Sequence, residues 1–461
     1  MKIMTVKRHW FGDSGIRLDA SYHLSEGLIT MRKLNKCPYP ISLLKDETEN
    51  IFKGGIFRRT YVDFIENGYE FITASEMMKS DISGGKFISK KYSDIDHLFV
   101  KNGWTLVSRS GTLGNTVYTS DIFKGKVLTD DLIRIVPNNK NVLSGYLYAF
   151  LTSHYGYGLL TQSGYGGVIQ HIEPHHIENI PIPILPEETQ QKIHNLIVDA
   201  ANLRVEANKL LKEAVAIMEE KLVSFSTDAT SSFKAKNYSV KINLLKAHNN
   251  RLDATYNAGW FDWFYSKLEK ADIQTRTVSE LSHKVFTPNI FKRVRTDNPS
   301  LGIPFLSGSD LLSAFPKMDS LLSKRMSNIE NYILKNGWLA IQDAGTIGYV
   351  TYIHEFLNGV AATNNLIRII PKEEENYNPY IFTFLKSKIG QKILASFEFG
   401  SVQKHIDNHQ LSALKIPVIS EIYDTITTKT ISSMEFFSKA CFNEKTAIDL
   451  IEKEIDQWQQ L

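Results

Sequence analysis

The longest regular hydrophobic pattern in the chain covers residues 186–225, where apolar residues recur at alternating steps of three and four. No glycine or proline interrupts the run after Pro186, and Glu187 and Glu188 follow that proline, as expected at a helix start. This heptad spacing is typical of a helix that packs lengthwise on another helix. We therefore predict a central spacer helix over residues 186–225. Its apolar seam would consist of Ile193, Leu196, Ala200, Leu203, Ala207, Leu210, Ala214 and Ile217.

A second seam of the same kind occupies the C-terminal segment, residues 420–461. Two seams of this length predict that the two helices pack on each other, although each helix could instead pack only on its own domain. Thr430 and Glu444 are polar interruptions of the second seam. Its apolar members are Met434, Phe437, Cys441, Ile448, Ile451, Ile455 and Trp458.

An internal repeat with a constant offset of 234 positions relates the two halves of the chain. Lys101-Asn102-Gly103-Trp104 recurs unchanged at 335–338, and Leu132-Ile133-Arg134-Ile135 recurs at 366–369. Each repeat therefore comprises one globular domain followed by one long helix. The predicted segments are a first domain at 1–185, the spacer helix at 186–225, a second domain at 226–419 with a linker at 226–238, and the second helix at 420–461. A connector rich in serine and threonine, residues 224–233, joins the two repeats.

The domains combine short strands with short helices, which places the chain in the α+β class. Residues 104–107 and 117–118 have a strand pattern on either side of a glycine-containing loop, and 132–136 form a further strand. Residues 146–152 have a helical pattern. The alternating prolines in 180–184 exclude a helix and predict an extended segment.

Composition sets limits on the partners and the compartment. The chain has 461 residues and a net charge of only +3, so a nucleic-acid surface would have to be local. Two cysteines, Cys37 and Cys441, cannot form a disulfide framework and fit a reducing cytosol. Neither a signal peptide nor a membrane-spanning run is present in the sequence, so we expect a cytoplasmic protein without a membrane partner.

Motifs for catalysis are missing from the sequence. The chain contains no phosphate-binding loop of the Gly-x-x-x-x-Gly-Lys-Ser/Thr type and no motif for methylating a flipped base. His171, His175 and His176 could be metal ligands, but the second repeat keeps only His405 and His409, and no cysteine or carboxylate cluster completes a site. We expect no metal, no cofactor bound by this chain and no catalysis by the chain itself.

Both repeats carry loops that mix arginine, lysine, glycine, threonine, asparagine and aromatic residues, which suits contact with DNA phosphates and base edges. For any single residue, a solvated charged loop is an equally good interpretation. The candidate DNA contacts in the first repeat are Lys53, Arg58, Arg59, Tyr61, Lys90, Lys91, Arg109, Ser110, Thr112, Asn115, Tyr165, Gln170 and His171. Those in the second repeat are Lys292, Arg293, Arg295, Lys324, Arg325, Gln342, Thr346, Tyr349, Gln403, Lys404 and His405.

Several motifs resemble the specificity subunits of type I restriction-modification systems. Trp104 lies seven residues before Gly111-Thr112-Leu113-Gly114, and the same spacing recurs after Trp338. The segment 132–135, the Tyr-Leu-Tyr helix at 146–148 and the Pro-Ile-Pro entry to the spacer helix match the family as well, so that the resemblance covers nearly the whole chain.

The resemblance implies two target-recognition domains in tandem and an antiparallel coiled-coil spacer formed by the two helices. It implies double-stranded DNA as the ligand, two methyltransferase subunits that use S-adenosylmethionine as partners, a motor endonuclease subunit as a further partner, and a role in phage defence. The residues alone leave two alternatives open: a two-site scaffold that binds protein or carbohydrate, and the DNA reader of another methylation-based defence system.

Overall fold

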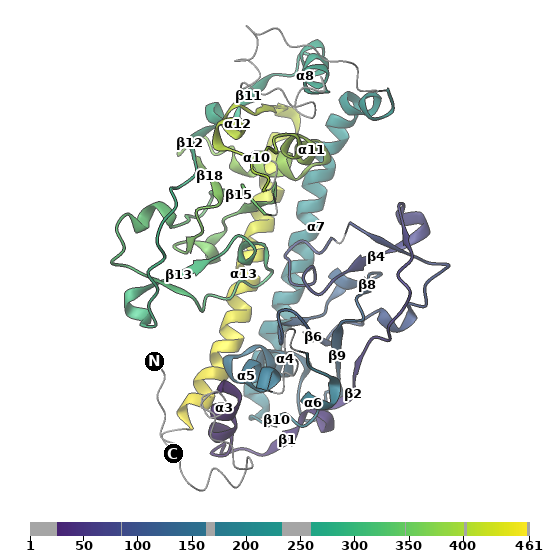
Figure 1. Cartoon of the computed structure of the whole chain (residues 1–461), viewed down its shortest axis with the longest axis vertical. Coiled ribbons are helices and arrows are strands. Elements are labelled where there is room, and N and C mark those ends of the chain that lie inside the picture. The colour runs from purple at the N-terminus through teal and green to yellow at the C-terminus, as the bar shows by residue number, and fades with distance from the viewer. Residues whose placement is uncertain are drawn as a thin grey trace. The chain divides into compact units, whose positions relative to one another are not determined.

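The computed structural model describes residues 25–83, 85–162, 171–232, 260–345, 347–400 and 403–458. The chain forms two compact units: residues 1–205 together with 439–461 make up unit 1, and residues 206–438 make up unit 2. Each unit contains one globular domain together with part of both long helices (Figure 1). The fold is α+β, as predicted.

Unit 1 is built on an antiparallel sheet of four strands in the order β2-β9-β6-β7. A second sheet, β3-β5-β4-β8, ends in the parallel pair β4-β8, and β1 pairs with β10 separately. The strands are β1 Ile41–Leu43, β2 Thr48–Lys53, β3 Tyr61–Val62, β4 Gly68–Ile72, β5 Phe87–Ser89, β6 Thr105–Ser108, β7 Thr116–Tyr118, β8 Val127–Leu128, β9 Leu132–Pro137 and β10 Pro181–Pro183. The helices of its globular domain are α3 Glu26–Leu34, α4 Ser144–Thr152, α5 His154–Gln162 and α6 Pro174–Ile177.

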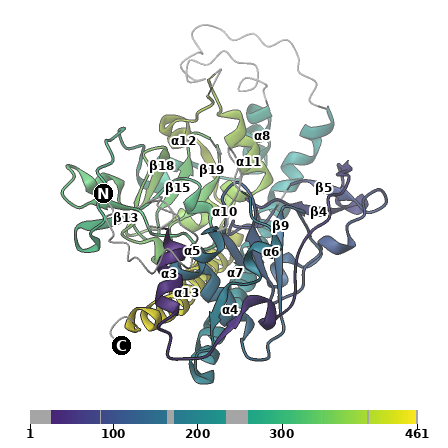
Figure 2. The same cartoon turned by 60° about the horizontal axis from the view of Figure 1, so that its bottom comes forward.

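Unit 2 repeats this architecture with the sheets β12-β18-β15-β16 and β14-β13-β17 and the pair β11-β19. β18 begins at Leu366 and β9 at Leu132, which is the offset of 234 residues that the sequence predicts. Its strands are β11 Thr275–Thr277, β12 Ser282–Phe286, β13 Gly302–Leu306, β14 Leu321–Ser323, β15 Leu339–Gln342, β16 Val350–Tyr352, β17 Ala361–Ala362, β18 Leu366–Pro371 and β19 Lys415–Pro417. Its helices are α8 Trp260–Lys270, α9 Val278–Leu281, α10 Asn378–Lys386, α11 Lys388–Ser396 and α12 Asn408–Ala413. α10 packs against β16 and β18. α10 and β18 are labelled in Figure 2.

The two predicted long helices are present as α7, Glu187–Ser232, and α13, Ser420–Gln457. α7 is longer than predicted, because most of the expected connector at 224–233 is helical. Serine and threonine are weak helix formers, but that segment contains no glycine or proline to end the helix. No helix in the described part of the chain is both long and apolar enough to cross a membrane.

The buried stripe on α7 differs from the predicted seam at every second position. Ile193, Ala200, Ala207 and Ala214 are buried as predicted. The other four predicted positions are only half-buried: Leu196, Leu203, Leu210 and Ile217. The buried residues lie one position later, at Ile197, Leu211 and Met218. Arg204 takes the equivalent position in the second step and keeps partial exposure. The stripe is rotated because α7 packs on its neighbouring domain as well as on α13, as the shared cores of each unit show. The α13 seam is buried at every predicted apolar position.

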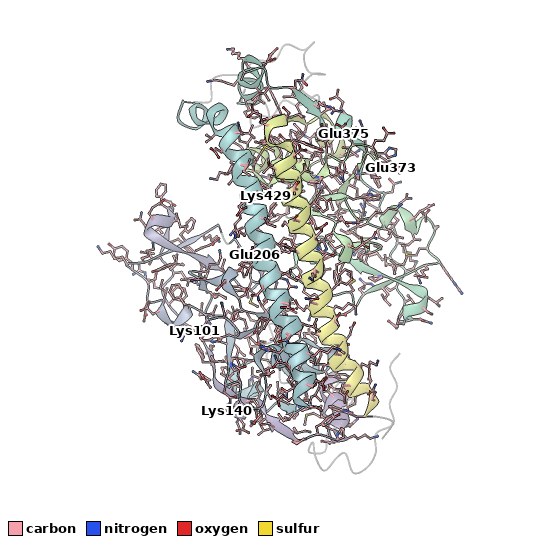
Figure 3. The ribbon with its side chains drawn as sticks, turned by 180° about the vertical axis from the view of Figure 1, so that it is seen from behind. Lys101, Lys140, Glu206, Glu373, Glu375 and Lys429 are labelled. Carbon is pink, nitrogen blue, oxygen red and sulfur yellow. The ribbon has the colours of Figure 1, made fainter. Side chains whose placement is uncertain are left out.

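The pairing of α7 with α13 is antiparallel. In unit 2 the Ser433 hydroxyl donates to the Ala207 carbonyl at 2.7 Å, and Lys429 pairs with Glu213 at 2.6 Å. Lys221 pairs with Glu421 at 2.6 Å, so that rising numbers on α7 face falling numbers on α13. Figure 3 shows the two helices side by side, with Lys429 on α13. The predicted helix pair is therefore confirmed, and each helix also packs on a globular domain.

The polar interruptions of the α13 seam anchor the domains. Thr430 and Thr383 of α10 share a hydrogen bond of 2.7 Å in unit 2. In unit 1, Glu444 pairs with Arg204 at 2.6 Å and accepts a hydrogen bond from the hydroxyl of Tyr148 on α4. These buried groups have partners, as the cost of burying polar atoms requires.

Each globular domain is also held at a helix N-terminus by a glutamate. At the start of α5, the His154 amide donates to Glu452 of α13 at 2.7 Å. At the start of α11, the Lys388 amide donates to Glu219 of α7 at 2.8 Å. A carboxylate at this position satisfies a free amide and complements the helix dipole. Each domain is therefore fixed to the long helix that follows the other domain in sequence.

Candidate nucleic-acid interface

The arginine of the repeated Leu-Ile-Arg-Ile strand serves the core. Arg134 on β9 and Arg368 on β18 are fully buried, and their guanidinium groups donate to backbone carbonyls at the ends of neighbouring strands and loops. Burial lowers the pKa of each arginine to about 10. Both arginines fix the loops around the sheets from inside and do not reach solvent.

In unit 1, three candidate residues form ion pairs or a hydrogen bond with the same two carboxylates. Lys53, at the end of β2, pairs with Glu173 at 2.9 Å. Arg109, just after β6, pairs with the same Glu173 and with Asp131 at 2.7 Å. Ser110 donates to the other oxygen of Asp131. Burial opposes ionisation of Glu173, but the hydrogen bonds from Lys53 and Arg109 outweigh it and lower the pKa of the carboxyl.

The candidate loop after β2 contains two arginines, of which one forms an ion pair within the described part of the chain and the other does not. Arg59 pairs with Asp130 at 2.7 Å and lies over the Phe71 ring, 5.4 Å from its centroid. Its pKa is raised, mainly by the hydrogen bond to Asp130. Arg58 is exposed, and its side chain has no hydrogen bond or ion pair with the described part of the chain. Gly54 lets the start of this loop lie close to the turn Asp96–Leu98, because a Cβ there would meet Leu98 at 2.5 Å.

The equivalent loop of unit 2 borders a groove of about 680 Å³. Its lining includes the basic residues Lys284, Lys292 and Arg325 and no carboxylate. Phe291 and Tyr332 form one wall, with their ring centroids 3.8 Å apart, and the Tyr332 hydroxyl donates to the backbone of the loop at 3.1 Å. The groove is therefore lined by cations and by one pair of aromatic rings.

The basic residues after β5 and β14 behave alike in the two units, whereas Arg59 and Arg293 differ. Lys90 and Lys324, at equivalent positions, each donate to a backbone carbonyl, at 3.2 and 3.0 Å. Lys91 and Arg325 follow them and are exposed. Arg293 is the equivalent of Arg59 and lies over the Phe305 ring at 5.0 Å. The position of Asp130, which pairs with Arg59 in unit 1, is an asparagine in unit 2. The loop cations of unit 2 are consequently less neutralised than those of unit 1.

The position of Arg109 carries the opposite charge in unit 2. Asp343 occupies it and lies next to His405 and the buried Arg368. Burial raises the pKa of Asp343, and the charges of His405 and Arg368 oppose this shift. A cation in one unit and a carboxylate in the other give the two loops different hydrogen-bonding chemistry on the same backbone.

Gln342 departs from the expectation for a DNA contact. It is 5% exposed, and its amide nitrogen donates to the Gly308 carbonyl at 2.7 Å, because the last residue of β15 points into the domain. The remaining candidates within the described part of the chain lie at or near the surface. They are Tyr61, Arg295, Tyr349, Gln403 and Thr112, all exposed, Asn115, His171 and His405, which are partly buried, and Lys404, which pairs with Glu398 at 2.7 Å.

Tyr165, Gln170 and Thr346 lie outside the described residues. Sequence reasoning missed Lys284 of the groove and the exposed Ile56 and Ile290. The equivalent positions of the two isoleucines in the repeat are a signal that could have identified them.

Of the three histidines near α6, His176 has a local structural role. The ring of His176 accepts a hydrogen bond from the Glu173 amide at 3.0 Å and caps the short helix. The rings of His175 and His176 lie 4.0 Å apart. Burial and the charge of His175 lower the pKa of His176. Among the described residues no group of three or more His, Cys, Asp or Glu side chains could hold a metal ion.

Comparison with known proteins agrees with this architecture. The family model of the type I restriction modification DNA specificity domain matches residues 48–215 and 270–422, one match for each repeat. The chain belongs to this family. The type I restriction enzyme MjaVIII specificity subunit of Methanocaldococcus jannaschii is 25% identical, over 73% of this chain and 74% of its own length.

Two solved structures are also similar in outline. The S subunit of a type I restriction-modification system from M. genitalium is 14% identical with a TM-score of 0.31, and covers 92% of this chain and 94% of its own. The HsdS subunit from Thermoanaerobacter tengcongensis is 12% identical with a TM-score of 0.28, and covers 91% and 96%. The chain is thus a DNA specificity subunit of the type I restriction-modification class, which does not itself catalyse a reaction.

Proposed function

We propose that each globular domain recognises one half of a bipartite, asymmetric DNA target in the major groove, and that the helix pair sets the unread gap between the halves. The observation that supports this most directly is the repeat itself. The same scaffold carries cationic loops twice, but the chemistry of the loops differs, as Arg109 and Asp343 illustrate. Arginine donates to guanine edges, whereas a carboxylate accepts from a cytosine amino group, so the two domains would prefer different bases.

The helix pair would also dock the catalytic partners. We expect two methyltransferase subunits, which bring S-adenosylmethionine, and a motor endonuclease subunit in the complete complex. The repeat supplies two long helices, one after each globular domain, which suits two copies of one partner. The complex would act in the cytoplasm, where the genomic DNA of a prokaryotic host is found.

Binding to duplex DNA at several salt concentrations tests the proposal. Cations that neutralise phosphates release counterions, so the logarithm of affinity should fall linearly with the logarithm of salt concentration. Mapping of methylated adenines in DNA modified by the assembled complex should then give two short sequences separated by a fixed gap. A salt-independent affinity, or methylation without a bipartite motif, would contradict the proposal and favour a scaffold for protein or carbohydrate.

A further inference from the structure

Two isoleucines occupy equivalent loop positions in the two units and are almost completely exposed. Ile56 is 94% exposed and Ile290 is 88% exposed. Burial of an isoleucine side chain stabilises a fold, and neither residue makes this contribution where it stands. Both repeats nevertheless place the same Ile-Phe pair there. The side chains therefore suit a contact that forms only when a ligand is bound.

The phenylalanine that follows each isoleucine fixes the loop. Phe57 packs edge-on against the buried Phe71, with 6.2 Å between ring centroids, and Phe291 stacks on Tyr332. Because the next residue is anchored, each isoleucine is held at the tip of an ordered loop. A tip that is already ordered loses little conformational entropy when it binds.

The surroundings of both tips are cationic. Ile290 lines the groove of unit 2 together with Lys292 and Arg325, whose side-chain cations have no ion-pair partner in the described part of the chain. Arg58 lies two residues after Ile56, and its side chain has no ion-pair partner in the described part of the chain either. An apolar tip between free cations complements a polyanion with an apolar interior, and duplex DNA has stacked bases between two rows of phosphates.

We propose that Ile56 and Ile290 insert between neighbouring base pairs within the two half-sites, and that the adjacent cations hold the flanking phosphates. This inference rests on the proposed function. An isoleucine that contacted one particular base would be expected to differ between two domains of different sequence preference. A wedge that separates a base step tolerates several sequences, so the same residue can serve both domains.

Fluorescence of 2-aminopurine placed at successive steps of each half-site tests the proposal in the full-length chain. Binding of the unaltered protein should raise the fluorescence at one step in each half-site, because unstacking relieves quenching. Ile56→Ala should abolish the rise in one half-site only, and Ile290→Ala in the other. Each substitution should weaken binding about tenfold, the loss of roughly one buried apolar contact. Thermal unfolding should not change, since both side chains are exposed.

Two sets of variants complete the test. Ile431→Ala, on α13 and 39% exposed, is the matched control and should change neither signal. Lys292→Ala with Arg325→Ala should reduce the slope of log affinity against log salt by about two, with the half-site sequences unchanged.

The result that would overturn the inference is sequence-specific binding with unchanged fluorescence and affinity in both isoleucine variants. Normal DNA binding combined with weaker methyltransferase association would also overturn it, because the tips would then contact a protein. If the unaltered chain itself showed no preference for any DNA sequence, the proposed function would fail, and this inference with it.

Discussion

The buried ion pair between the long helices allows a quantitative test of the packing in unit 1. Glu444 has 2% of its side chain exposed and Arg204 has 15%, and their charged atoms are 2.6 Å apart. Tyr148 adds its hydroxyl to the same carboxylate. Burial and the charge of Glu444 raise the pKa of the Tyr148 hydroxyl far above its usual range, so this group stays a hydrogen-bond donor.

Glu444→Gln keeps the volume of the side chain but leaves Arg204 in the interface without its counter-charge. Removal of one partner from a buried pair costs about 3–5 kcal/mol, and we expect this loss in urea unfolding of the full chain. Replacement of the whole cluster, with Arg204→Met, Glu444→Leu and Tyr148→Phe combined, should restore stability to within about 2 kcal/mol, because no polar group remains unpaired.

The exposed pair formed by Lys445 and Asp449 on the same helix provides the control. Its atoms are 2.7 Å apart but half-exposed, so Asp449→Asn should change stability by less than about 0.5 kcal/mol. The reasoning would be refuted if Glu444→Gln cost no more than the control substitution. It would also be refuted if the triple variant were as unstable as Glu444→Gln.

Two further predictions concern the length of the helix pair and the stability of the chain at low pH. One heptad inserted between Val205 and Glu206, with another between Ser438 and Lys439, falls at the boundaries of the two units in the sequence, so that no unit is interrupted within its own residues. It adds about 10 Å to each helix and should lengthen the unread gap by up to about three base pairs in methylation mapping. The lowered pKa of Glu173 predicts stability that is present above its ordinary value of 4.5 and is lost as pH falls through the lower folded value. Urea midpoints below pH 4.5 should therefore fall less steeply in Glu173→Gln than in the unaltered chain.

The periodic features of the sequence predicted most of the fold. Apolar spacing and the constant offset located both long helices and strands such as Leu132–Pro137, because core positions must follow the period of the element that carries them. Spacing did not give the rotation of the α7 stripe, which depends on a second packing surface. It also did not predict that 226–232 is helical.

The candidate site was predicted less completely, because charge pairing depends on residues distant in sequence. Lys53 and Arg109 are held by Glu173, which lies 120 and 64 positions away. Nothing local to Arg58 or Arg59 indicates that only the second meets a carboxylate. The exposed isoleucines were missed because exposure of an apolar residue cannot be inferred from composition.

Exchange of one unit tests the central claim most directly, that the chain contains two separate readers joined by a helix pair. Unit 2 is one continuous segment, 206–438, and can be replaced by the equivalent segment of a related specificity subunit with both junctions inside the long helices. Methylated adenines should then be mapped in DNA modified by the assembled complex. We expect one half of the target to change while the other half and the length of the gap stay the same. A change in both halves would contradict the claim.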